Sequence, residues 1–150
     1  MGVANRTGRL EKGYLENTKT GKILRFQYNP EEFSDDIQVA YREIKSPGIS
    51  YPIYQYIGGE PRQIEFTLFL DNMENTGGLN KVRETISFLN TFLPPHNKGA
   101  RYAPPPELIF GFGWFVKPCI LVGMPTRYTM FDRNLQPLRA EVDVILKIIQ

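Results

Sequence analysis

Alternating apolar and polar residues predict β-strands along most of the chain. The clearest case runs from Arg62 to Asp71, where Ile64, Phe66, Leu68 and Leu70 alternate with mostly polar neighbours. The same period of two predicts further strands at 9–16, 22–28, 33–44, 107–112, 114–124, 127–131 and 138–149. A strand with this period places one face in the core and the other in solvent. We therefore predict about eight strands, most of them half-buried.

One segment has a helical period instead. Its apolar residues recur at spacings of three and four, at Leu79, Val82, Ile86, Leu89 and Leu93. Two prolines at 94–95 follow and end the helix, because proline lacks the N–H that a helix needs. Many strands with a single helix predict a mainly β (α+β) fold. We expect an antiparallel β-sandwich or barrel with one amphipathic helix over an opening.

Length and composition indicate one globular domain spanning residues 1–150, with residues 1–8 as a flexible N-terminus. Hydrophobic residues make up 41% and charged residues 23%, both ordinary for a globular protein. The longest apolar runs, such as 119–124, are far too short to cross a bilayer, so no membrane partner is expected. The formal net charge of +2 is too balanced to indicate nucleic-acid binding by itself.

Residues suited to catalysis are scarce. The chain has one cysteine, Cys119, and one histidine, His96, which excludes an internal disulfide and a metal site built from Cys or His clusters. Two carboxylate pairs, Glu31–Glu32 and Asp35–Asp36, lie next to the Asn29-Pro30 turn, where solvated or capping acids are common. We therefore assign no catalytic, cofactor-binding or metal-binding residues. The sequence favours a binding or structural protein over an enzyme.

Two other classes of function remain open on the residues alone. Aromatic residues lie among basic ones at 22–28, which is compatible with a small β-barrel that stacks on single-stranded nucleic acid. A strand with a core face and a wet face explains the same spacing. A small hydrolase is the third class, and it is the least favoured because nucleophile–base pairs are so few.

The segment from Lys45 to Pro61 differs from the rest of the chain. It contains three prolines, three glycines, three tyrosines and three isoleucines. One interpretation is a surface loop with a short edge strand. The other is an arm that packs on a neighbouring subunit, because this much exposed Tyr and Ile is unfavourable on a monomer. The expected contact residues of such an arm are Ile49, Tyr51, Ile53, Tyr54, Tyr56 and Ile57, with the first three on one face if the segment is extended.

Several short motifs, in order, resemble those of a known family. They are Phe26-Gln27-Tyr28-Asn29-Pro30-Glu31; Gly58-Gly59 followed by 62–71; Pro104-Pro105-Pro106 before Gly113-Trp114; and Arg127-Tyr128-Thr129-Met130-Phe131 followed by Pro137, Arg139 and Ala140. The chain thereby resembles, from Leu10 to Ile149, the tube domain of contractile injection systems. That group includes baseplate hub and tube-adaptor proteins of long-tailed phages. One departure is Asn134-Leu135-Gln136, which stands where the family has a glycine in the last turn.

The resemblance implies a tail-tube fold in which six copies close into a ring. It implies a structural protein of a phage tail or related injection system, located in the virion tail or baseplate after assembly in the bacterial cytoplasm. The expected role is the hub or tube adaptor that joins the tail tube to the spike, with the main tube subunit as the alternative. Expected partners are further copies of the chain, the tube protein and the spike or hub proteins. DNA or cargo would pass only transiently through the lumen. The LysM domain that many relatives carry is not expected here.

Overall fold

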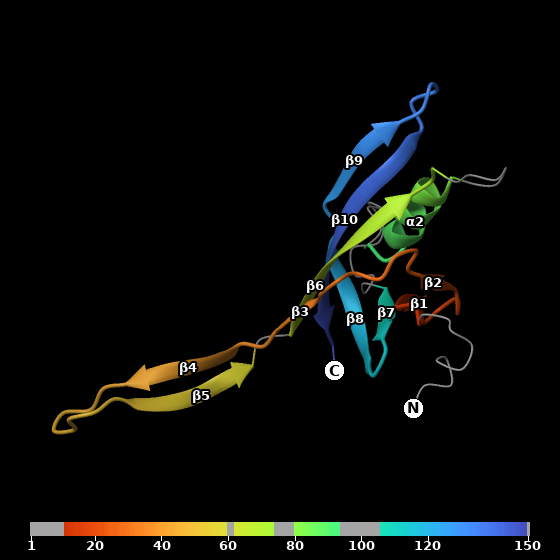
Figure 1. Ribbon diagram of the computed structural model, residues 1–150. Coiled ribbons are helices and arrows are strands. Elements are labelled where there is room, and N and C mark those ends of the chain that lie inside the picture. Colours follow the sequence, from red (N-terminus) through yellow and green to blue (C-terminus); the bar gives the residue numbers. More distant parts are fainter. Residues whose placement is uncertain (1–10, 60–61, 74–79, 94–105, 150) are drawn as a thin grey trace, which may run out of the picture.

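The computed structural model describes residues 11–59, 62–73, 80–93 and 106–149 (Figure 1). Within these ranges the chain forms a mainly antiparallel β structure with one helix, as the sequence predicts. The elements are β1 (Tyr14–Asn17), β2 (Ile23–Arg25), β3 (Ser34–Asp36), β4 (Val39–Ile44), β5 (Ile53–Gly59), β6 (Gln63–Asp71), α2 (Lys81–Asn90), β7 (Glu107–Phe112), β8 (Phe115–Gly123), β9 (Thr126–Phe131) and β10 (Pro137–Ile148).

Eight of the strands form one sheet in the order β2-β1-β7-β8-β10-β6-β3, with β9 paired to β10 outside this path. The longest pairing joins β10 to β6, from Arg139 opposite Asp71 to Lys147 opposite Gln63. The C-terminal part of β10 also pairs with β8, and its N-terminal part pairs with β9. The twelve residues of β10 therefore form the central strand of the body.

The sheet curls until residues far apart in its strand order touch. Phe66 on β6 and Phe110 on β7 have two strands between them in the sheet, yet their rings stack with centroids 5.0 Å apart. Phe26, which follows β2, lies 5.4 Å from Phe66, and Phe33 packs against Phe110 at 5.6 Å. Such contacts require a strongly curved sheet, and they confirm the predicted sandwich-or-barrel class.

Alternation along β6 and β10 builds the core. The inward side chains of both strands are buried, and those of α2 and β7 meet them to form one cluster. Among its fully buried members are Ile64, Val82, Leu89, Leu108, Val142, Val144 and Leu146. The helix begins at Asn80, whose side-chain oxygen accepts hydrogen bonds from the backbone N–H groups of Val82 (3.0 Å) and Arg83 (3.2 Å).

Most element bounds differ from the prediction by about one residue, and the following differ by more. The predicted strand 33–44 is two strands, β3 and β4, because β3 pairs with β6 in the body whereas β4 pairs only with β5. The strands predicted at 9–16 and 22–28 correspond to β1 (Tyr14–Asn17) and β2 (Ile23–Arg25), and residues 9–10 lie outside the described residues. The predicted helix shortens to α2, and Leu79, Pro94, Pro95 and residues 1–8 lie outside the described residues.

The turn between β9 and β10 contains no glycine, although the resemblance leads us to expect one there. Leu135 has φ of 60°, in the left-handed region that glycine favours and that costs another residue roughly 1 kcal/mol. Asp132 holds this turn, because its carboxylate accepts hydrogen bonds from the backbone N–H groups of Asn134 (2.8 Å) and Gln136 (3.0 Å). The turn therefore closes without a glycine, and β9 and β10 pair beyond it with register shifts between Pro137 and Ala140.

Candidate subunit interface

A two-stranded arm projects from the body of the molecule. Strands β4 and β5 pair only with each other, and Figure 1 shows the hairpin pointing away from the main sheet. The arm as the structure has it spans residues 39–59. It therefore begins six residues before the predicted segment, and residues 60–61 of that segment lie outside the described residues. The segment is therefore not a surface loop with a short edge strand of the main sheet, because its strand β5 pairs with β4 in a separate hairpin.

The root of the arm is fixed to the body by an ion pair. The Arg62 guanidinium, just before β6, donates two hydrogen bonds to the Asp35 carboxylate on β3. This hydrogen bonding raises the pKa of Arg62 further above its ordinary value, so the guanidinium stays charged. Both strands that border the root are thereby tied together where the chain enters and leaves the arm. The Asp35 carboxylate is thus engaged in this anchor.

The pairing register sorts the arm's side chains onto two faces. Tyr41 lies opposite Tyr56, and Glu43 lies opposite Tyr54, so these four share one face. The rings of Tyr41 and Tyr56 meet edge to face at 6.1 Å, which agrees with this assignment. Arg42 opposite Gln55 and Ile44 opposite Ile53 form the second face. One face is thus rich in tyrosine and the other in isoleucine.

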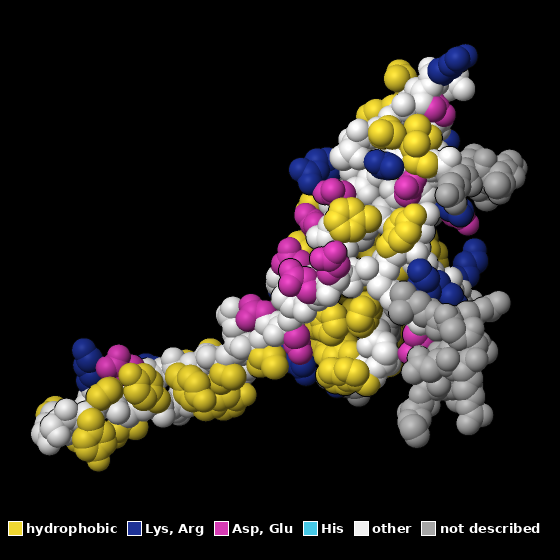
Figure 2. All heavy atoms as spheres, in the orientation of Figure 1, with side chains coloured by type: hydrophobic (Ala, Val, Ile, Leu, Met, Phe, Trp, Pro, Cys, Tyr) yellow, Lys and Arg dark blue, Asp and Glu magenta, His cyan; other side chains and the backbone are white. Residues whose placement is uncertain are grey.

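Neither face of the arm is covered by its own chain. Tyr54, Tyr56 and Ile57 are 62%, 63% and 62% exposed, and the apolar residues of the second face are exposed as well. Figure 2 shows apolar side chains along most of the arm. An isolated two-stranded hairpin is marginally stable in water, and contiguous exposed apolar surface marks an interaction site. The arm therefore has the properties of a surface that another chain covers.

The six residues predicted to make this contact fall into two groups. Ile53, Tyr54, Tyr56 and Ile57 lie on β5, whereas Ile49 and Tyr51 lie in the loop that joins the two strands. The expected common face of Ile49, Tyr51 and Ile53 requires an extended segment, and the strand begins only at Ile53. The prediction missed the contribution of β4, including Val39 and Tyr41. The signal for these was present as alternation in 33–44, but it was attributed to a strand of the body.

A groove lies on the outer face of the body. It has a volume of about 690 Å³, and its floor includes Glu65, Thr67 and Phe69 on β6 together with Glu141 and Asp143 on β10. Glu31 and Glu32 line its wall, and Arg127 is its basic residue. Five carboxylates and one guanidinium give these lining residues a formal charge of −4. Figure 2 shows acidic side chains gathered beside apolar ones on this part of the body.

The Phe26–Glu31 motif has mainly structural roles. The Gln27 amide donates to the backbone oxygen of Asp71 (2.9 Å) and accepts from its N–H (3.0 Å), so it pairs with the end of β6 as a strand would. The Asn29 side chain accepts from the Gly13 N–H (2.9 Å) and donates to the Glu11 oxygen (2.8 Å). These bonds fasten the segment after β2 to β6 and to the chain before β1. In the sequence analysis this motif served only as part of the family resemblance. Its hydrogen bonds to the end of β6 and to the chain before β1 were not predicted.

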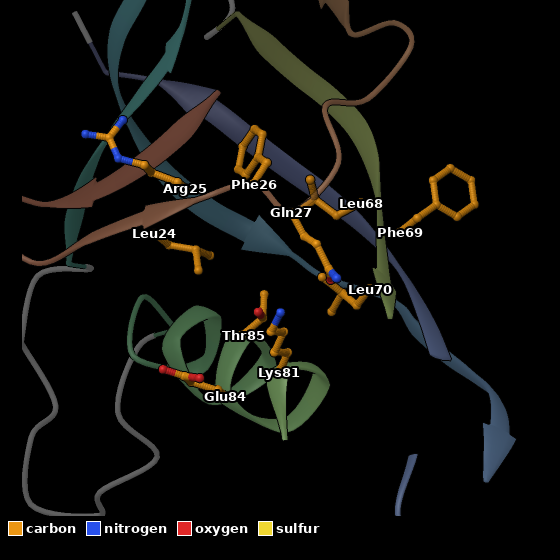
Figure 3. Close-up of a pocket in the computed structure, with 10 residues that line it drawn as sticks. All are labelled: Leu24, Arg25, Phe26, Gln27, Leu68, Phe69, Leu70, Lys81, Glu84 and Thr85. Carbon is orange, nitrogen blue, oxygen red and sulfur yellow. The ribbon is translucent and has the colours of Figure 1, made fainter. Parts of the chain in front are cut away.

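A smaller pocket, of about 280 Å³, lies between α2 and the strands β2 and β6 (Figure 3). Arg25 and Lys81 supply basic groups, and Glu84 supplies a carboxylate. Figure 3 shows Lys81, Glu84 and Thr85 on the helix side, with Leu24 and Gln27 on the strand side. None of the residues that line this pocket is a cysteine or a histidine.

The candidate nucleophile, Cys119, is buried on β8, with an exposed fraction of 0%. Burial raises the pKa of the Cys119 thiol to about 12, so the nucleophilic thiolate is negligible at neutral pH. Its possible base, His96, lies outside the described residues. Glu31 and Glu32 line the groove together, whereas Asp35 is engaged by Arg62. The structure therefore brings no two of these candidates into a catalytic arrangement within its described ranges.

The described residues contain neither a metal-binding cluster nor a membrane-spanning helix. Across these ranges no group of three or more His, Cys, Asp or Glu side chains is arranged to hold a metal ion. The helix of the described chain is too short and too polar to span a membrane.

Comparison with known proteins places this geometry in a family. The family model described as "Contractile injection system tube protein" matches residues 10–149, nearly the entire chain. No curated protein matches the chain at a significant level. The matched span is almost the same as the span of the ordered motifs, from Leu10 to Ile149, and it includes the body and the arm. The chain belongs to the contractile injection system tube protein family and is a tube-type structural protein of such a system.

Proposed function

We propose that six copies of this chain close into a ring, and that the ring is the adaptor joining the tail tube to the spike or hub at the baseplate. The observation that carries the ring is the arm, an apolar hairpin of 39–59 exposed on both faces. A ring requires head-to-tail contacts between two different surfaces of each subunit. The arm supplies one such surface and a neighbour's body supplies the other.

The adaptor role rests on the resemblance of the motifs to baseplate hub and tube-adaptor proteins. In that position each ring contacts the tube on one side and the spike proteins on the other, and DNA or cargo passes through its centre. The mechanism is assembly and conduction, with no turnover. A near-neutral chain suits such a channel, because extensive phosphate neutralisation would retain a polyanion.

The main tube subunit is the second candidate, and the family match is compatible with both roles. Copy number separates the two roles, because an adaptor contributes one or two rings whereas a tube protein contributes dozens. An electron-microscopy map of the purified particle would measure both symmetry and copy number. We expect six-fold rings of this chain at the baseplate end of the tube. Two-fold or three-fold rings of this chain would refute the proposal.

A further inference from the structure

The two faces of the arm carry opposite charges. On the isoleucine-rich face, with Ile44 and Ile53, the charged residue is Arg42. On the tyrosine-rich face the charged residue is Glu43, between Tyr41 and Tyr54. A partner surface of strong charge therefore distinguishes the faces: an acidic surface attracts the Arg42 face and repels the Glu43 face.

The groove on the outer face of the body is such an acidic surface. In its floor, Asp143 accepts a hydrogen bond from Thr67 (2.8 Å), and Glu141 is paired with Arg127. Across the described ranges, Glu31, Glu32 and Glu65 form no ion pair. Phe69 offers an apolar surface that is half exposed, on the same face of β6 as Glu65. The groove thus combines negative charge with an apolar patch.

The arm matches this combination. Arg42 lies on the same face as Ile44 and Ile53, so one ribbon face presents a cation beside two apolar side chains. Guanidinium groups bind carboxylates through paired hydrogen bonds, and isoleucine side chains can cover an exposed phenylalanine ring. The arm and the groove are complementary in charge and in apolar surface.

The arm cannot fill the groove of its own chain, because the hairpin points away from the main sheet (Figure 1). We propose that the Arg42 face of one subunit's arm docks in the acidic groove of a second copy of the chain. Arg42 faces Glu65 and the wall carboxylates, and Ile44 and Ile53 cover Phe69. This inference rests on the proposed ring, and it names the surface that receives the arm. The tyrosine face stays outward, available to the next component of the tail.

Charge reversal in assembled particles tests the docking. In particles carrying Arg42→Glu, we expect incorporation of this chain to fall by about tenfold or more, because a carboxylate then faces the acidic groove. Glu43→Arg is the matched control one residue away on the opposite face, and it should leave incorporation unchanged. Adding Glu65→Arg to Arg42→Glu should restore incorporation. Equal loss with both single variants, or no rescue by the second change, would refute the docking.

A cross-link identifies the contact directly. In a Cys119→Ser background, Ile53→Cys with Phe69→Cys should give chains cross-linked between subunits when particles are treated with a short thiol-specific reagent. Tyr54→Cys with Phe69→Cys, on the tyrosine face, is the control and should give little product. If rings of this chain are present but the first pair does not cross-link, the docking is wrong and the ring stands. If a particle map shows no such rings, the proposed function itself is wrong.

Discussion

Two antiparallel strand pairs, β6–β10 in the body and β4–β5 in the arm, have similar pairing but differ in burial. In β6 every second side chain from Ile64 to Leu70 is buried, and β10 follows the same rule. The arm has the same antiparallel pairing and many apolar residues, but none of its side chains is buried. Its apolar residues therefore cannot be explained by the folding of their own chain. The difference teaches that apolar residues in a strand predict that it is covered, but do not show whether its own chain or another chain covers it.

The sharpest test of this difference compares one apolar truncation in each pair. Leu68→Ala should lower the free energy of unfolding of the monomer by about 2–5 kcal/mol, because Leu68 is buried in the core and leaves a cavity. Ile53→Ala in the arm should change it by less than about 0.5 kcal/mol, because Ile53 is exposed. Urea denaturation of the two variants measures both values. Similar losses in both would mean that the arm folds onto its own body.

The next effect concerns the closure of the body. Gln27→Ala removes two hydrogen bonds to the Asp71 backbone, and we expect it to lower the free energy of unfolding by about 1–3 kcal/mol. Thr18→Ala provides the control, since its hydroxyl makes an exposed bond of 3.2 Å to Glu107, and a much smaller loss is expected. Thermal unfolding followed by circular dichroism compares them. A neutral Gln27→Ala would show that the side chain does not close the sheet.

A smaller effect is expected at the root of the arm. Arg62→Gln removes the ion pair with Asp35, which is partly exposed, so we expect only a small loss of stability, less than that of Gln27→Ala. High salt should reduce the difference between wild type and variant further, because the charges are then screened. Denaturation at two ionic strengths provides the measurement. A loss as large as that of Leu68→Ala would instead show that the root of the arm is packed as part of the core.

The last effect appears only at high pH and concerns the ionisation of Cys119. Its thiol has a pKa of about 12 in the fold against an ordinary value of 9.0, so the folded state holds this proton more tightly. The stabilising contribution is complete below pH 9 and is lost as the pH rises from 9 toward 12. The free energy of unfolding of Cys119→Ser should therefore fall less steeply between pH 8 and pH 10.5 than that of the wild type, as measured by urea denaturation at each pH. Parallel curves for both proteins would contradict the burial of the thiol.

Much of the body was predictable because its strands are half-buried. Alternation located β6 and β10, and helical spacing located α2, since each has one face fixed by the core. The division of 33–44 was not predictable from its pattern, because alternation persists through Ile37, Val39 and Tyr41 although only β3 pairs with the body. The pairing of Gln27 with Asp71 was also out of reach, because nothing local relates residues 44 positions apart.

The candidate interface was predicted by composition and corrected by geometry. Tyrosine, isoleucine, proline and glycine in 45–61 indicated an arm, yet its second strand pairs with residues before Lys45. The acidic groove was not predicted at all, because its carboxylates come from three separate segments of the chain. Glu31 and Glu32 were its only visible signal, and they were interpreted as solvated residues beside a turn.

Hydrogen exchange of the arm tests the central claim most directly. In the free monomer the backbone amides of 39–59 should exchange quickly, because a lone two-stranded hairpin opens readily, while those of β6 and β10 should be protected. In the assembled ring the arm should become protected, and the body should change little. Equal protection of the arm in both states would contradict the account and show that no neighbouring subunit covers the hairpin.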